Sequence, residues 1–173
     1  MSDNIICCEL YPSVFNKRIY ELHCECFPEN NHVFEKHINM IVDMCNNTLS
    51  KVLIDKKNNL VIGYILFLVG YTYSEDGYSY LPNDSNIILF NIGIKREYQN
   101  KKIGSIFLKQ IIDREIKKMN NKNYSIELIV REDNNRAKRV YKKLNFVQKR
   151  IIPNHFKNIN INGLLYSLRL NNK

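Results

Sequence analysis

The sequence predicts a fold of the α+β class, a seven-stranded sheet with helices on both faces. Short apolar segments typical of strands alternate with longer segments whose apolar residues recur at helical spacing. The chain has 173 residues, of which 45% are hydrophobic, and this is enough for one buried core. It contains no internal repeat and no long stretch rich in Pro, Gly or Ser. We therefore expect residues 1–173 to form a single domain.

The first half of the chain is expected to form two helices and three strands. Pro12 favours the start of a helix, because proline fits the first helical turn. Lys57-Asn58-Asn59 is typical of a turn between two strands. The expected elements are a strand over Ile5–Leu10, helices from Pro12 to about Glu25 and from about His32 to Cys45, a hairpin of Lys51–Asp55 with Leu60–Tyr73, and a loop over Ser74–Asn86.

The second half is expected to form four strands and two helices. Its first strand is continuously apolar, which is typical of a strand at the centre of a sheet. The expected elements are a strand over Ile87–Ile94, an amphipathic helix from Ile103 to about Met119, a strand over Tyr124–Arg131, a short helix from Asn134 to Leu144, and strands over Phe146–Ile152 and Leu164–Leu170.

Positive charge is concentrated in the second half of the chain. The formal net charge is +9, yet residues 95–173 hold 20 basic and 6 acidic side chains, whereas residues 1–94 hold 6 basic and 11 acidic ones. This asymmetry indicates an anionic partner for the second half. No RNA-binding signature or set of stacking aromatic residues accompanies it, so a nucleic-acid partner is not expected.

Other classes of protein are excluded by pattern. The longest apolar run, Leu60–Tyr73, has 14 residues and is too short for a transmembrane helix. The N-terminus lacks the pattern of a secretory signal. The cysteine count of five is odd and shows no disulfide framework, which favours a reducing compartment and a cytoplasmic protein. His23, Cys24 and Cys26 lack a second pair of ligands, so no metal site is expected.

The turn after the central strand has the features of an anion site. The first N–H groups of a helix have no partner within it and carry partial positive charge. Lys101 and Lys102 add full charges there, and Gly104 would let a ligand approach the backbone closely. A pyrophosphate group fits such a turn. The alternative, on residue types alone, is an ordinary turn from strand to helix.

Two motifs make the prediction more specific. Gln99-Asn100-Lys101-Lys102-Ile103-Gly104 matches the pattern Gln/Arg-x-x-Gly-x-Gly/Ala, with Lys102 in place of the first Gly. Asn134-x-x-Ala137-x-x-x-Tyr141-x-Lys143-x-Asn145-Phe146 matches N-x-x-A-x-x-x-Y-x-K-x-G-F, with Asn145 in place of Gly. In these motifs and in the order of its elements, the chain resembles the GNAT superfamily of acetyl-CoA-dependent N-acetyltransferases over essentially its whole length.

This resemblance implies the GNAT fold, a mixed, mostly antiparallel seven-stranded sheet with splayed central strands and four helices on both faces. It also implies acetyl-CoA as the cofactor, and Tyr141 as the general acid that protonates the leaving thiolate. The alternatives are a helix N-cap for Asn134 and a packed helix residue for Tyr141. The implied cofactor-binding residues are Ile92, Gly93, Ile94, Gln99, Asn100, Lys101, Lys102, Ile103, Gly104, Ser105, Asn134, Tyr141 and Lys143.

An amine acceptor must lose a proton, so the site also needs a base or a water chain. Glu127 is the first candidate, because it lies two residues before Ile129 and therefore on the same face of that strand. His155, near the last hairpin, is the second candidate. The alternatives are a solvent-exposed strand carboxylate for Glu127 and a surface loop residue for His155.

Within the superfamily, the chain most resembles the Golgi-type protein N-terminal acetyltransferases. Phe27-Pro28, the loop before the central strand and the segment 152–168 carry this resemblance. It implies that a peptide N-terminus is bound by Phe27, Pro28, Asn31, Asn154 and Phe156. That group relays the amine proton through a strand Tyr and a strand His, and those positions are Ile88 and Ile129 here. The group's membrane-binding tail is not found after the last strand, so Golgi anchoring is not expected.

The sequence therefore predicts an N-acetyltransferase whose best acceptor is a protein N-terminal α-amine. An alternative within the superfamily is an enzyme for a small amine, such as glucosamine 6-phosphate. A further alternative is an acyl-CoA-binding adaptor without catalytic activity. The oligomeric state is left open.

Overall fold

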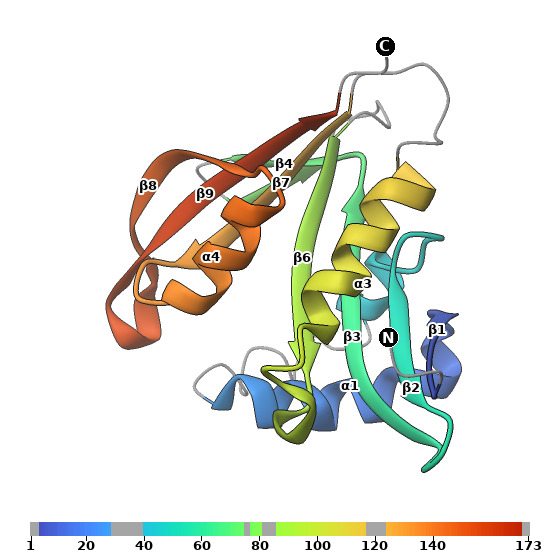
Figure 1. The fold of residues 1–173 in the computed structure, drawn as a ribbon. Coiled ribbons are helices and arrows are strands. Elements are labelled where there is room, and N and C mark those ends of the chain that lie inside the picture. The colour runs from blue at the N-terminus through green and yellow to red at the C-terminus, as the bar shows by residue number, and fades with distance from the viewer. Residues whose placement is uncertain (1–3, 29–39, 75–76, 81–85, 117–123, 171–173) are drawn as a thin grey trace. The chain divides into compact units, whose positions relative to one another are not determined.

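The computed structural model describes residues 4–28, 40–74, 77–80, 86–116 and 124–170. Residues 40–44 are helical, and the preceding part of the helix predicted from His32 lies outside the described residues. The other elements are β1 Ile5–Glu9, α1 Pro12–Cys26, β2 Lys51–Asp55, β3 Leu60–Val69, β4 Tyr71–Ser74, β5 Gly77–Tyr80, β6 Asn86–Ile94, η2 Arg96–Tyr98, α3 Ile103–Ile111, η3 Ile112–Ile116, β7 Tyr124–Arg131, α4 Asn135–Lys143, β8 Val147–Phe156, η4 Lys157–Ile159 and β9 Ile161–Leu170 (Figure 1).

Seven strands form one mixed sheet in the order β1-β2-β3-β6-β7-β9-β8, and β4 and β5 form a separate two-stranded sheet. The pairs β1–β2, β2–β3, β7–β9 and β8–β9 are antiparallel, whereas β6 and β7 are parallel. The parallel register of β6 and β7 covers only Asn86–Ile88 and Ser125–Glu127, as expected for splayed central strands. The predicted mixed, mostly antiparallel sheet is confirmed.

The chain divides into two compact units, and each is described by itself. Unit 1 consists of Met1–Phe67 and Asn91–Glu115, and unit 2 of Leu68–Phe90 and Ile116–Lys173. None of the helices that the structure describes is long and apolar enough to cross a membrane.

In unit 1, helices α1 and α3 cover opposite faces of β3 and β6. On one face, the buried Tyr64 of β3 bonds to His23 of α1 through its hydroxyl. On the other face, Ile92 and Ile94 of β6 lie against Gly104 of α3. Because β3 is covered on both sides, every residue from Val61 to Leu68 is buried.

In unit 2, β7 has one buried and one half-buried face. Tyr124, Ile126, Leu128 and Val130 are buried, and the residues between them are half-buried. Helix α4 packs on the buried face, where the Tyr141 ring meets Tyr166 of β9, the register partner of Leu128. The opposite face therefore carries Ser125, Glu127, Ile129 and Arg131.

The predicted strand Leu60–Tyr73 and loop Ser74–Asn86 were wrong in detail. Gly70 adopts a φ of 80°, which ends β3 at Val69, and β4 then starts at Tyr71. Part of the predicted loop is strand β5, which pairs with β4. Cross-strand contacts between tyrosine rings stabilise this hairpin despite its polar composition, Tyr71 with Tyr80 and Tyr73 with Tyr78.

The boundaries of three other elements also differ from the predictions. Helix α3 ends at Ile111 and continues as a π-helical turn, Ile112–Ile116. Strand β8 runs to Phe156 rather than Ile152, and β9 begins at Ile161 rather than Leu164. Strand β8 passes Pro153 because it is an edge strand whose register shifts between Ile152 and Phe156.

We predict that Gly93→Ala destabilises the protein by about 1–3 kcal/mol, because it overpacks a rigid site. A Cβ at Gly93 would lie 2.5 Å from Cε1 of the fully buried Tyr64. The matched control is Gly104→Ala, whose Cβ would lie 3.2 Å from Cγ1 of Ile94 and 3.4 Å from Cδ1 of Ile92, so it meets no atom closer than 3 Å. Urea unfolding of both variants measures the difference, and equal stability losses would contradict this account of Gly93.

Candidate functional site

The turn from β6 to α3, residues 99–105 of unit 1, keeps a left-handed backbone at two positions. Asn100 has a φ of 62°, and Lys102, the N-cap of α3, has a φ of 60° and a ψ of 7°. Lys102 occupies the position where the motif has glycine. Glycine adopts this left-handed conformation without strain. For lysine the same conformation costs about 1–2 kcal/mol.

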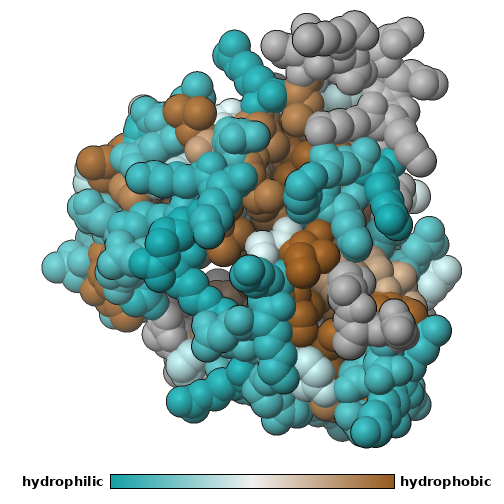
Figure 2. All heavy atoms as spheres, viewed as in Figure 1, coloured by the Kyte–Doolittle hydropathy of each residue, from teal (hydrophilic) through white to brown (hydrophobic). Residues whose placement is uncertain are grey.

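The N-terminus of α3 presents backbone donors without a side-chain cap. Lys102 makes no capping hydrogen bond, and its carbonyl accepts bonds from the Ile106 N–H at 3.0 Å and the Ser105 hydroxyl at 2.8 Å. Lys101 and Lys102 are exposed, and the Lys101 ammonium lies 5.1 Å from the centre of the Tyr98 ring. Hydrophilic residues cover most of the face that Figure 2 shows. This terminus suits an anion.

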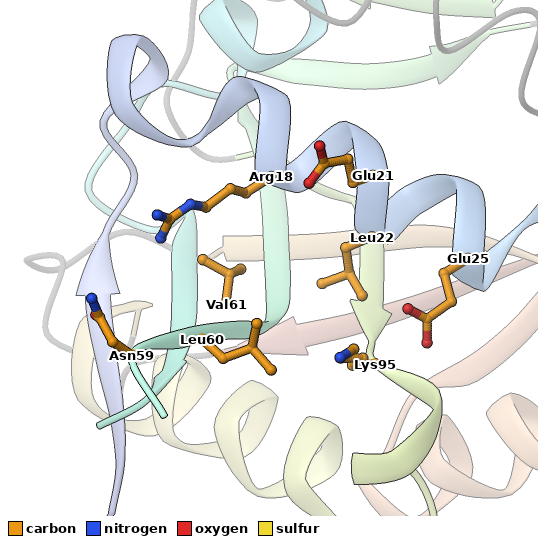
Figure 3. A pocket seen from close by; sticks show the side chains of 8 residues that line it. All are labelled: Arg18, Glu21, Leu22, Glu25, Asn59, Leu60, Val61 and Lys95. Carbon is orange, nitrogen blue, oxygen red and sulfur yellow. The ribbon is translucent and has the colours of Figure 1, made fainter. Parts of the chain in front are cut away.

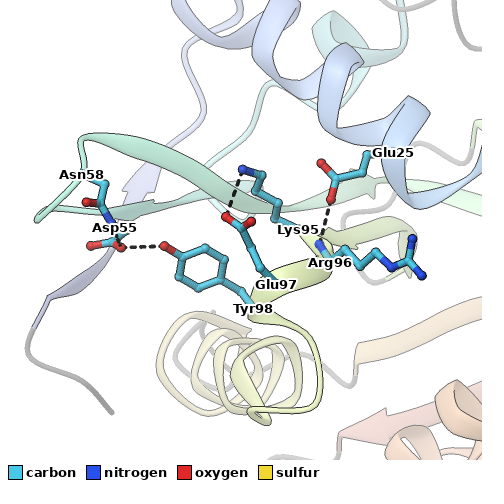
Figure 4. Close-up of polar contacts among 7 residues, drawn as sticks. All are labelled: Glu25, Asp55, Asn58, Lys95, Arg96, Glu97 and Tyr98. Atoms are coloured by element: carbon cyan, nitrogen blue, oxygen red, sulfur yellow. Dashed lines mark hydrogen bonds and ion pairs between the residues drawn. The ribbon is translucent and has the colours of Figure 1, made fainter.

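The 3₁₀ turn η2, which precedes residues 99–105, is held by a hydrogen bond at each of its ends (Figure 4). The Arg96 N–H donates to Glu25 of α1 at 2.8 Å, and the Tyr98 hydroxyl donates to Asp55 of β2 at 2.7 Å. The Tyr98 bond, with smaller contributions from Lys57 and Asn58, holds the pKa of Asp55 below its usual value despite partial burial. The same bond raises the pKa of Tyr98. The turn is thus tied to two different elements of unit 1.

The last residues of β6 are held from within unit 1. The carbonyl of Ile94 accepts bonds from the Gln99 side chain at 2.8 Å and from the Cys26 thiol at 3.3 Å. Both acceptor sites of that carbonyl are therefore used by the protein, which leaves it no lone pair for a ligand. The missing side chain at Gly104 makes room for Ile92 and Ile94, and its part in binding a ligand stays a prediction.

The second motif, in unit 2, forms helix α4 with a defined cap at each end. The Asn134 side chain accepts a bond from the Ala137 N–H at 3.0 Å, so the N-cap alternative for Asn134 is what the structure shows. At the other end, Asn145 has a φ of 65°, its N–H bonds to Lys142, and the Phe146 N–H bonds to Tyr141. These two bonds form a Schellman motif with asparagine in the glycine position.

Tyr141 is buried in unit 2, with its ring against Phe146 and Tyr166. Burial raises the pKa of its phenol to about 12. The phenol therefore stays protonated at neutral pH and can serve as a proton donor. Lys143 lies in the exposed last turn of α4, where its charge also complements the helix dipole.

Both predicted bases lie on one face of unit 2. Glu127 and Ile129 share the half-buried face of β7, and Glu127 accepts a bond from the Thr72 hydroxyl at 3.4 Å. A Cβ at Gly163 would lie 2.8 Å from Ile129 and 2.9 Å from the Cβ of His155. His155 therefore lies beside Ile129, on the face that also carries Glu127.

Comparison with known proteins places this geometry in a family. The model of the acetyltransferase (GNAT) family matches residues 16–146. The chain belongs to this family. No curated protein is similar enough in sequence to count as a match.

Solved structures share the fold at low sequence identity. Ard1 from Thermoplasma volcanium has a TM-score of 0.70 and 16% identity, over 98% of this chain and 99% of that one. Arabidopsis thaliana Naa50, in complex with the bisubstrate analogue CoA-Ac-MVNAL, has a TM-score of 0.67 and 20% identity, over 95% and 98%. A mutant of the spermidine N-acetyltransferase SpeG from Vibrio cholerae has a TM-score of 0.64 and 16% identity, over 97% and 95%.

The predicted acceptor-binding residues of this GNAT chain fall in both units. In unit 1, Phe27 caps the end of α1 and its ring lies 4.9 Å from His23, Pro28 is exposed, and Asn31 lies outside the described residues. In unit 2, Asn154 is exposed with a φ of 49°, and the Phe156 ring lies 4.8 Å from His155.

His23 and Cys26 of α1 have hydrogen bonds within unit 1. Nδ1 of His23 lies 2.9 Å from the Tyr64 hydroxyl, and burial lowers the pKa of His23 to about 4. Burial, together with Glu25, raises the pKa of Cys26 to about 11. Across the described ranges, no three His, Cys, Asp or Glu side chains form a group that could hold a metal ion.

A separate groove of about 340 Å³ lies in unit 1, between α1 and the start of β3 (Figure 3). Arg18 and Asn59 line one end, and Glu25 and Lys95 line the other. None of the predicted site residues is among its lining residues.

The sequence did not indicate Tyr73, which this family chain places next to a candidate base. Its hydroxyl lies 3.1 Å from Nδ1 of His155. The two residues are 82 positions apart in sequence, and Tyr73 belongs to the hairpin that was predicted as strand and loop. The alternating tyrosines of Tyr71-Thr72-Tyr73 and Tyr78-Ser79-Tyr80 are the signal in the sequence for this pair of strands.

We predict that Lys102→Gly raises the free energy of unfolding by about 1 kcal/mol, because glycine adopts the left-handed conformation without the Cβ penalty. The matched control is Lys101→Gly, which removes the same charge at a neighbouring residue outside the left-handed positions. We expect no gain in the control. Chemical unfolding of both variants measures the free energy of unfolding. An equal gain in stability in both would mean that the loss of charge, and not the backbone conformation, causes the effect.

Proposed function

We propose that the chain transfers the acetyl group of acetyl-CoA to a primary amine, with a protein N-terminal α-amine as the acceptor. One observation carries this proposal beyond family membership. Lys102 and Asn145 replace the glycines of both motifs, yet each has the left-handed backbone that those positions require, with φ of 60° and 65°. The two segments that define cofactor binding in the resemblance thus keep their form. Residues 1–173 are proposed to act as one domain.

The residues present fit acetyl-CoA. The uncapped N-terminus of α3, with Lys101 and Lys102, would hold the pyrophosphate, because its N–H groups and cations complement the phosphate charge. Ile92 and Gly93 would bind the pantetheine arm by their backbone groups. Asn134 uses its side-chain oxygen as the N-cap, so its amide N–H₂ would be the part that contacts the cofactor.

Acetyl-CoA supplies the thioester whose acetyl group is transferred. Tyr141 would donate its phenolic proton to the sulfur that leaves, and burial keeps this phenol protonated. The amine proton would go to His155 or Glu127, the two candidates on one face of unit 2. Burial lowers the pKa of His155 below its usual value, so its imidazole is neutral and able to accept a proton at neutral pH.

The identity of the amine acceptor rests on fewer observations than the cofactor does. The fold similarity to Naa50 in complex with CoA-Ac-MVNAL favours a peptide N-terminus, and the similarity to a spermidine N-acetyltransferase favours a small amine. Phe27 and Phe156 offer apolar side chains suited to a peptide. A small phosphorylated amine such as glucosamine 6-phosphate is the alternative, and an adaptor that binds acyl-CoA without turnover is a third candidate.

A thiol-release assay with acetyl-CoA tests the proposal directly. The acceptor panel contains peptides of different N-terminal residues, the same peptides with a blocked N-terminus, glucosamine 6-phosphate and spermidine. We expect release with free N-termini and none with blocked ones. Thiol release with the sugar phosphate alone would contradict a peptide acceptor and favour a small phosphorylated amine. Tight acetyl-CoA binding without thiol release would favour the adaptor.

We predict that Tyr141→Phe lowers kcat by about 100-fold, the size expected on loss of a general acid. The affinity for acetyl-CoA should change little, because phenylalanine keeps the ring contacts with Phe146 and Tyr166. The matched control is Tyr166→Phe, which removes a hydroxyl from a buried neighbouring ring. Steady-state kinetics and calorimetric acetyl-CoA binding separate the two quantities. An unchanged kcat in Tyr141→Phe would remove it as the general acid.

A further inference from the structure

We propose that Tyr73 of β4 is a positioning residue for His155, and that this pair prepares the amine of the acceptor for attack. The inference rests on the proposed function and names the group that takes the amine proton. It assigns a role to a residue outside both motifs.

The first support is the place of His155 in unit 2. Its Cβ and the Cγ2 of Ile129 both lie within 3 Å of the position of a Cβ on Gly163. His155 thus lies on the half-buried face of β7, beside Ile129. The absence of a side chain at Gly163 leaves the space that the imidazole occupies.

The second support is the set of contacts on the imidazole. The Tyr73 hydroxyl lies 3.1 Å from Nδ1, and the two rings meet edge to face with centres 5.7 Å apart. The Phe156 ring stands at 90° to the imidazole, 4.8 Å away. Two aromatic rings and one hydrogen bond therefore define the orientation of this side chain, which is half-buried.

The third support is the set of contacts made by the hairpin that carries Tyr73. Its ring meets Tyr78 of β5, and Tyr78 in turn meets Phe90 of β6. At the base of the hairpin, the Gly70 N–H donates to the Asn86 carbonyl at 2.8 Å. A hydroxyl on such a framework can hold Nδ1 in one place.

In the proposed arrangement, Nδ1 of the neutral imidazole carries the proton and Nε2 is the basic nitrogen. When the Nδ1–H donates to the Tyr73 oxygen, the lone pair of the neutral ring is on Nε2. In the proposed step, the amine N–H bond breaks, its proton passes to Nε2, and the electron pair stays on the amine nitrogen. The imidazolium that forms keeps its Nδ1–H bond to Tyr73, which stabilises it.

The charged and titratable groups around this pair come from several elements. The Arg150 guanidinium of β8 lies 5.7 Å from the centre of the Tyr73 ring. The Tyr78 ring of β5 lies edge to face with the same ring, with centres 5.8 Å apart. Glu127 of β7 shares the face of His155 and is bonded to Thr72. Glu127 is thus the competing base, and the experiment must separate it from His155.

The test compares Tyr73→Phe with Tyr71→Phe, a matched control on the same strand whose ring contacts Tyr80 instead. Nitrogen-15 NMR of the imidazole groups reports the tautomer and the pKa of His155, with His155→Gln identifying its signal among the four histidines. In Tyr73→Phe we expect a lower His155 pKa, because the acceptor of the imidazolium Nδ1–H is lost. Tyr71→Phe should match the unchanged protein.

Kinetics of the same variants supply the second readout. Tyr73→Phe should lower kcat by about tenfold, leave the KM for acetyl-CoA unchanged, and move the acid limb of kcat/KM to lower pH. An unchanged His155 pKa and pH profile in Tyr73→Phe would overturn the inference. Full turnover by His155→Gln together with its loss in Glu127→Gln would also overturn it. A shifted His155 pKa in a chain that acetylates no amine would instead contradict the proposed function.

Discussion

The organisation of unit 1 depends on one buried hydroxyl, that of Tyr64. It donates to Asn91 of β6 at 3.1 Å, and so accepts from Nδ1–H of His23 on α1, at 2.9 Å. Burial keeps His23 neutral and raises the pKa of Tyr64, so neither group carries a charge in the core. The Tyr64 ring also occupies the space above Gly93. A single side chain of β3 thus joins α1 to the strand that leads into the turn of residues 99–105.

The two motif departures show how a backbone conformation can persist without glycine. Asn145 adopts the left-handed region at low cost, because asparagine tolerates it better than other residues with a Cβ. Lys102 has no such advantage, and the anchored turn η2 with the start of α3 holds it there. Its cation lies at a helix N-terminus, where it opposes the helix dipole and so does not stabilise the helix. The same cation would attract a phosphorylated ligand.

Local patterns predicted most of the fold, and contacts distant in sequence explain what they missed. Strands β6 and β7 and helix α4 were predicted within one or two residues, because their apolar spacing and caps are local. The β4–β5 hairpin was missed, because tyrosine pairing outweighs its polar composition only once the strands meet. The motif of residues 99–104 predicted the turn for the same local reason, whereas the catalytic role of Tyr141 stays a prediction. The bond from Tyr73 to His155 follows from the tertiary fold, and no spacing in the sequence predicts it.

Burial also gives unit 2 a division of chemical roles. The same desolvation raises the pKa of the Tyr141 phenol to about 12 and lowers the pKa of the His155 imidazole. Both groups are therefore neutral at neutral pH, the phenol with a proton to give and the imidazole with a lone pair to accept one. Amine acetylation requires one group of each kind, since the amine loses a proton and the leaving sulfur gains one. Opposite pKa shifts with a common cause thus suit Tyr141 to the acid role and His155 to the base role that we propose, with Glu127 as the competing base.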